Sequence, residues 1–502
     1  MKKWKSLSGT TALFLVLSGA AQAQVTAAEV WENWKSVAEG MGQILTPGSQ
    51  TQNGGTLTIR DLAVSMDVPE MSMSGTIGMI EFRDQPGGTV AITMSPTYDF
   101  QMAASPPDGE KVDLTLQISQ PDLKITASGG QGTVNYDITA PSVSVTVPSL
   151  IVDGKPVEMD FDLTASDVTG NYQMTEGAMT DIVSKLNAAM VTVKVDVSKP
   201  GGGGNFAADA SFADLAITSD GTMTMMGGMD DMAAMLASGF ATSGSFAHGA
   251  ATYAVDFQDG ADNFKLNGTS DSGMLALELD ADAISYETGN TGLSFTLSGS
   301  DIPLPEIAAS FNEIGMSFLM PLAESDVPQD FGASLVLDGL SVSDMIWGIA
   351  DPTGALPHDP ASFIVNITGK GNWLVDIMNP EATAELEDEM PAELHSLDLN
   401  ELRVAVAGAE LTGTGGFTFD NNNLETFGGM PAPDGVVDLM LVGGNGLLDR
   451  LVAMGLIPED QAMGARMMMG LFARPGGGED TLTSKIEVKP DGSISANGQR
   501  LQ

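Results

Sequence analysis

The sequence predicts a mostly β protein, built as one long antiparallel meander with a few short helices. In many separate runs, apolar residues alternate with small or polar ones, as in strands that have one apolar face. Turn signals rich in glycine, proline and aspartate separate these runs. There is no cysteine among 502 residues, so an apolar core must hold the fold together without disulfides. Because an apolar sheet face cannot stay in water, we expect an elongated sheet closed as a sandwich or curled into a trough.

The first 23 residues predict a secretory signal peptide. A lysine-rich start (MKKWK) precedes a short apolar run (TALFLVL). The small-x-small sequence Ala21-Gln22-Ala23 then predicts cleavage and a mature start near Gln24. No later stretch is apolar for long enough to cross a bilayer, so we expect no transmembrane segment in the mature chain. The predicted location is the periplasm.

Charge is the strongest compositional signal. The formal net charge is −45, and it becomes −48 once the three lysines of the leader are removed. A chain this acidic repels nucleic acid and anionic lipid surfaces, which makes both poor candidate partners. We interpret the acidity mainly as a solvated surface, with cation binding as the alternative.

The elements follow in order along the chain. Thr26-Ala27-Ala28-Glu29 matches a capping box before a helix that runs to about Leu45. From residue 55 the apolar period becomes two, as in Leu62, Val64 and Met66, and such strands recur to the C-terminus. Apolar spacing predicts helices over 176–190, 229–236, 343–350, 447–455 and 458–472. The chain should close with a hairpin over 485–496.

Domain organisation is predicted as a signal peptide over 1–23 and one elongated β-rich region over 24–502. Glycine-rich 201–204 and proline-containing 324–329 are possible sub-boundaries within that region. No fixed-period repeat is evident.

A methionine tract raises the question of copper, because the stretch from Met223 to Met235 contains six of the 31 methionines. Thioether ligands select Cu(I), but the chain has only three histidines and none lies in this tract. A strand, a Gly-Gly turn and a short helix account for the tract as soft packing. We therefore treat one set of residues as a candidate wall or lid for an apolar ligand: Met226, Met229, Met232 and Met235.

Catalytic and cofactor motifs are not found. Without cysteine there is no thiol nucleophile and no thiolate metal site, and no paired-histidine zinc motif occurs. Carboxylates are so abundant that close pairs say little about catalysis. We assign no catalytic, metal or cofactor-binding residue and expect no cofactor.

The C-terminal third resembles a known family. The signposts are turns, strand starts and a helix pair: Val342-Ser343-Asp344-Met345-Ile346-Trp347, Leu356-Pro357-His358-Asp359-Pro360, Leu411-Thr412-Gly413-Thr414-Gly415-Gly416-Phe417, Leu447-Leu448-Asp449-Arg450-Leu451 and Gly492-Ser493-Ile494-Ser495-Ala496. Together they resemble domain-of-unknown-function family 2125, exported proteins of Gram-negative bacteria without an established activity. The resemblance implies export and a β-rich architecture, and it supplies no site residues.

The functional expectation is a non-enzymatic periplasmic protein that binds or carries lipid-like apolar molecules. An apolar lining rich in methionine and poor in aromatic residues, which are 6% of the chain, suits a flexible apolar guest. It also suits an ordinary core. The alternative is therefore an envelope scaffold or interaction protein with a closed interior, and a hydrolase is a third possibility.

Overall fold

A computed structural model describes residues 24–106, 109–130, 132–177, 179–198, 203–223, 232–378 and 391–501. β-Strands account for most of this part of the chain, and helices are few. The helices are α1 (Ala27–Gly40), α2 (Met232–Ala237), α3 (Asp344–Ala350), α5 (Gly444–Ala453) and α6 (Glu459–Phe472).

The strands of the N-terminal half are β1 (Ile44–Asn53), β2 (Thr56–Val68), β3 (Met71–Gln85), β4 (Thr89–Met94), β5 (Thr97–Ala104), β6 (Val112–Ser119), β7 (Lys124–Gly130), β8 (Thr133–Val152), β9 (Lys155–Pro156), β10 (Glu158–Thr175), β11 (Thr180–Ser198), β12 (Gly204–Met223) and β13 (Thr242–His248). Those of the C-terminal half are β14 (Ala251–Asp259), β15 (Asp262–Ser270), β16 (Ser272–Leu279), β17 (Ala283–Gly299), β18 (Ile307–Pro321), β19 (Gln329–Val342), β20 (Ala361–Trp373), β21 (Ala392–Val406), β22 (Ala409–Asp420), β23 (Ala432–Val442), β24 (Arg474–Pro475), β25 (Thr481–Val488), β26 (Ile494–Ala496) and β27 (Gln499–Arg500).

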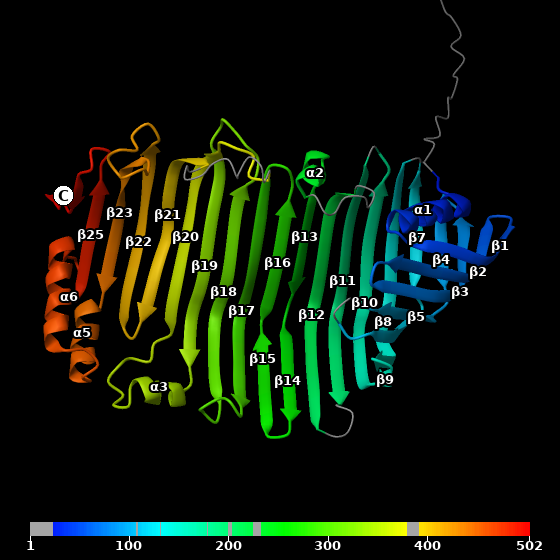
Figure 1. The fold of residues 1–502 in the computed structure, drawn as a ribbon, viewed down its shortest axis with the longest axis horizontal. Coiled ribbons are helices and arrows are strands. Elements are labelled where there is room, and N and C mark those ends of the chain that lie inside the picture. Colours follow the sequence, from blue (N-terminus) through cyan, green and yellow to red (C-terminus); the bar gives the residue numbers. More distant parts are fainter. Residues whose placement is uncertain are drawn as a thin grey trace, which may run out of the picture.

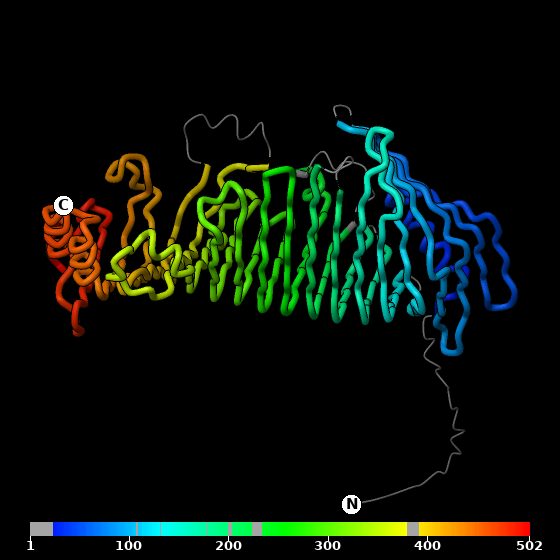
Figure 2. The backbone as a smooth tube through the Cα atoms, turned by 90° about the horizontal axis from the view of Figure 1, so that it is seen from below, coloured from blue at the N-terminus to red at the C-terminus, as the bar shows by residue number. Residues whose placement is uncertain are grey.

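All of these strands belong to one antiparallel sheet. Most strands pair with their neighbours in sequence, as expected for a meander, and the ladder extends along the long axis of the molecule (Figure 1). α1 lies at one end, and α5 and α6 lie at the other. In Figure 2 the first strands lean out of line with the regular row formed by the rest. The predicted fold class, a long antiparallel meander with a few short helices, is confirmed.

Most predicted helices are present, but α1 ends at Gly40, before the predicted end near Leu45, and Leu45 belongs to β1. α1 begins after Thr26 with the predicted capping box, in which the hydroxyl of Thr26 accepts from the backbone of Glu29 and the Glu29 carboxylate accepts from Thr26. α3, α5 and α6 match the predicted segments, and the closing hairpin forms between β25 and β26. The described part of the third predicted helix, 229–236, is α2.

The helix predicted over 176–190 is wrong. Most of that stretch is β11, which pairs along its length with β10 on one side and β12 on the other. The apolar residues of this stretch also fit a period of two, and they include the β-branched pair Ile182 and Val183. Cross-strand pairing on both sides therefore overrides the helical spacing.

The sheet continues past both possible sub-boundaries. β11 and β12, on either side of 201–204, pair with each other, as do β18 and β19 on either side of 324–329.

Residues with positive φ interrupt several strands in mid-length, and we call the line of these interruptions the crease. In β10 the more buried positions are odd-numbered at Met159 and Phe161 and even-numbered from Val168 to Tyr172, and Asp167 between them has φ 49°. Asp61 in β2, Asp214 in β12 and Gly339 in β19 have similar positive φ values. A residue with left-handed backbone geometry interrupts the regular pleat, as in a β-bulge. As a result, apolar side chains from both halves of a strand face the same side.

The main core lies at the N-terminal end. Trp31 and Val30 of α1 are buried against Leu57, Ile59 and Phe82 of the first strands. A second, smaller core cluster lies on the crease, where Ala140, Val168, Ala188 and Leu215 pack against neighbours that include Val143, Ala165, Val191 and Phe212. The two clusters hold opposite halves of the strands together on one face.

Candidate functional site

One row of mostly apolar side chains runs across the sheet from β2 to β25. Each member is the direct cross-strand partner of the next: Leu57, Phe82, Ile92, Ile125, Ile138, Gly170, Leu186, Ile217, Phe246, Leu275, Thr288, Met316, Leu335, Val365, Leu402, Gly413, Leu439 and Ser484. We call this row A. At ~4.8 Å between neighbouring strands it is about 80 Å long.

A second row lies on the other side of the crease. Row B consists of Tyr98, Ile118, Val145, Leu163, Val193, Ala210, Tyr253, Gly268, Phe295, Ala309 and Val342, again as successive cross-strand partners. The crease cluster joins the two rows, because Ala165 shares the face of Leu163, Val168 shares the face of Gly170, and both pack in that cluster. Rows A and B therefore line one apolar face, which we call the trough.

The burial of row A changes along its length. Under α1, Leu57, Phe82 and Ile92 of row A are almost completely buried. Farther along, Leu186 is 38%, Leu275 41% and Met316 45% exposed. Apolar surface therefore remains open to solvent along the middle of the sheet. Exposed apolar surface that is contiguous over several strands is typical of an interaction or ligand-binding site.

Neither row contains a charged residue. Cross-strand ion pairs such as Lys265 with Asp256 (2.7 Å) and Lys370 with Asp330 (2.6 Å) instead lie an odd number of positions along the strand from the row residues, and so point to the opposite face. The sheet thus has a polar face and an uncharged face. An apolar molecule can contact the trough without desolvating a carboxylate or an ammonium group.

α1 is fixed over the N-terminal end of the trough by several polar contacts. The backbone N–H of Ala27 donates to the Asp84 carboxylate (2.7 Å). The Tyr136 hydroxyl donates to Oδ1 of Asn33 (2.7 Å), and Nδ2 of Asn33 donates to Glu176 (3.3 Å). These contacts attach the helix to β3, β8 and the segment after β10.

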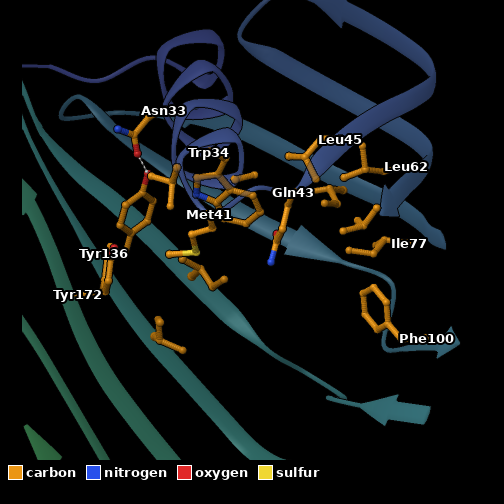
Figure 3. Close-up of a pocket in the computed structure, with 16 residues that line it drawn as sticks. Asn33, Trp34, Met41, Gln43, Leu45, Leu62, Ile77, Phe100, Tyr136 and Tyr172 are labelled. Carbon is orange, nitrogen blue, oxygen red and sulfur yellow. Dashed lines mark hydrogen bonds between the residues drawn. The ribbon is translucent and has the colours of Figure 1, made fainter. Parts of the chain in front are cut away.

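A pocket of about 460 Å³ lies between α1 and the sheet (Figure 3). From the helix side it is lined by Trp34, Val37 and Met41. The sheet contributes apolar side chains, among them Leu62, Val64, Ile77, Ile80, Phe100, Ile125, Ile138, Tyr136 and Tyr172. No charged residue lines it. A pocket of this size and lining is typical of sites for small apolar ligands.

Burial shapes the chemistry of the two tyrosines at this site. Desolvation raises the pKa of Tyr136 well above its usual value, and burial raises the pKa of Tyr172 as well. Both side chains are therefore neutral at physiological pH. They add aromatic surface without adding charge.

The methionines predicted as a ligand wall or lid lie elsewhere. Met226 and Met229 fall outside the described residues. Met232 and Met235 belong to α2, which lies near the strand ends beside β13 in Figure 1. Met235 does not line the pocket under α1. A role for them as wall or lid of the trough stays a prediction.

In the described part of the chain, no three His, Asp or Glu side chains form a group able to hold a metal ion. The helices described there are also too short or too polar to cross a membrane.

Comparison with known proteins connects the chain to one family. The family model described as "Uncharacterized protein conserved in bacteria (DUF2125)" matches residues 243–498. The chain belongs to this family. The matched region runs from the second residue of β13 through β26 and carries most of the open part of the trough. Both α1 and the pocket precede that region.

The other comparisons add little. No curated protein matches the chain. Among solved structures, the ferric citrate transporter FecA in its unliganded form aligns with 91% of this chain and 76% of its own, at 9% identity. Its TM-score is 0.17, which is too low to support a structural inference.

The pocket was not predicted from the sequence, although two signals point toward it. Trp31, Trp34, Phe82, Phe100 and Tyr136 concentrate aromatic residues near the N-terminus of a chain with few of them. The strands there also change apolar phase, as at Asp61 in β2. Together these signals indicate a thick apolar cluster under a folded sheet. They do not locate the gap within it.

Proposed function

We propose that this protein is a non-enzymatic binder or carrier of lipid-like apolar molecules that works in the periplasm. The observation that supports this most is row A. It is uncharged from β2 to β25 and half-exposed over its middle part. Leaving such a surface in water is unfavourable by about 25 cal/mol per Å² of apolar area. An apolar ligand relieves that penalty.

The length of the trough bears on how the ligand is held. Row A is about 80 Å long, whereas the hydrocarbon core of a whole bilayer is only about 30 Å thick. One acyl chain thus covers a small part of the row. Several chains in series, or one chain that slides, fit this geometry.

The experiment is to purify the protein without detergent, extract it with organic solvent and identify apolar molecules by mass spectrometry. The proposal expects acyl-chain molecules at one or more per protein. A stable protein that yields none would contradict it.

The same experiment discriminates the alternative, an envelope scaffold with a closed interior. A closed interior predicts neither bound lipid nor binding of an apolar dye to the native protein. The half-exposed row favours the binder over this alternative.

A further inference from the structure

The pocket under α1 is covered on one side by a helix, unlike the open middle of the trough. We propose that this pocket seats the methyl end of one linear acyl chain, whose remainder lies along row A. The inference rests on the proposed function and deepens it, because it names the part of the ligand that is held and the place that holds it.

The two halves of α1 differ in their fit to the sheet. Val30 and Trp31 in the first half are 0% and 1% exposed, so that half is sealed. Trp34 and Val37 in the second half, together with Met41 directly after the helix, border a pocket of about 460 Å³. The space is partly open to solvent, and an apolar pocket of this size and lining suits an apolar guest.

The absence of charge in the pocket lining indicates which part of an amphiphilic ligand can enter. No charged side chain lines the pocket, so a carboxylate or phosphate head group would be desolvated there without a counter-charge. The nearby polar groups already form hydrogen bonds with one another, because the Tyr136 hydroxyl donates to Asn33 and the side chain of Asn33 donates to Glu176. The pocket therefore suits the hydrocarbon end of an amphiphile.

Row A connects the pocket with the open trough through Ile138, Gly170 and Leu186. Ile138 lines the pocket, and Leu186 is already 38% exposed. A Cβ placed on Gly170 would lie 3.3 Å from Cδ1 of Leu186 and 3.6 Å from Cβ of Ile138. The glycine thus keeps side-chain bulk out of the passage, which fits a narrow, unbranched chain.

The test uses two stearate probes, one with a nitroxide at the methyl end and one with a nitroxide near the carboxyl group. Electron paramagnetic resonance reports whether the protein immobilises a probe anywhere. Quenching of tryptophan fluorescence reports proximity to Trp31 and Trp34 of α1, whereas Trp347 and Trp373 lie in the C-terminal half and provide the background. The methyl-end probe should quench more strongly than the carboxyl-end probe.

A matched pair of variants locates the effect. Val37→Phe adds bulk inside the pocket, and Ser36→Phe adds the same side chain at an exposed position of the same helix. Excluding two methylenes weakens binding by about tenfold. We therefore expect Val37→Phe to weaken binding of the methyl-end probe by about tenfold and to reduce quenching, with Ser36→Phe unchanged.

Two different outcomes would contradict the pocket assignment and the proposed function, respectively. Immobilisation of both probes with equal quenching, and with Val37→Phe binding as tightly as the parent protein, would overturn the pocket assignment and leave binding in the trough intact. Failure of the protein to immobilise either probe would overturn the proposed function itself.

Discussion

Single residues set the direction of the apolar face. Asp167 and Asp214 adopt φ near 50° in the middle of long strands, and the apolar phase of each strand changes there. Aspartate tolerates this geometry better than most residues that have a Cβ, and glycine tolerates it best. The crease therefore depends on whether the residues at these positions can adopt a positive φ. It does not depend on contacts of their exposed side chains.

The crease predicts losses of stability of different size for two substitutions at Asp167, which is exposed. Asp167→Val places a β-branched residue in a left-handed conformation and should lower the free energy of unfolding by about 1–2 kcal/mol. Asp167→Gly should lower it by less than about 0.5 kcal/mol. Urea unfolding followed by circular dichroism checks both, and equal losses would show that no backbone strain is involved.

Tyr136 predicts a dependence on alkaline pH. Because burial raises its pKa in the folded state, the unfolded chain ionises first, at about pH 10. Its contribution to stability is complete below that pH and is lost as the pH rises toward the folded pKa. In Tyr136→Phe, the decline of stability above about pH 10 should be shallower than in the parent protein. Thermal unfolding across that range measures the slope, and an unchanged slope would exclude Tyr136 as its source.

At the scale of elements, the two halves of α1 have different surroundings. The first turns of the helix close the N-terminal core, and the last turns cover the pocket. The helix itself was predictable, because a capping box and an amphipathic spacing lie within a few residues of one another. The pocket was not. It depends on which strands pair beneath the helix, and pairs such as Ile138 with Gly170 join residues far apart in sequence.

The predicted helix over 176–190 failed for a related reason. Local spacing in this stretch fits both periods, and only the partners supplied by β10 and β12 decide between them. The alternation of the other strands was recognised because it is long and unambiguous. The phase change at the crease was overlooked, although it is visible in β2 as Ile59 gives way to Leu62.

The two halves of α1 should respond differently to truncation. Trp31→Ala removes a fully packed side chain and should lower the free energy of unfolding by about 3–5 kcal/mol. Met41→Ala, over the pocket, should lower it by less than about 1.5 kcal/mol, because its side chain already borders empty space. Chemical denaturation of both variants provides the comparison. A large loss in Met41→Ala would indicate that the second half of the helix is packed as tightly as the first.

For the whole molecule, one sheet separates a charged face from an uncharged one. Carboxylates and ion pairs on the polar face, such as Lys265 with Asp256, keep the protein in solution. The trough stays free of charge from end to end. The region matched by the DUF2125 family model carries most of the open part of this trough.

The most direct measurement compares apolar molecules extracted from two variants of neighbouring residues in β16. Leu275 belongs to row A and is 41% exposed, whereas Met274 points to the opposite face and is 38% exposed. Both variants, Leu275→Asp and Met274→Asp, add the same charge at similar exposure, and each would be purified without detergent.

We predict that Leu275→Asp loses most of its bound acyl-chain molecules, about tenfold, because a carboxylate in the trough must be desolvated when ligand binds. Met274→Asp should retain the content of the parent protein. Equal lipid content in the two variants, or none in the parent protein, would contradict the trough as the binding site.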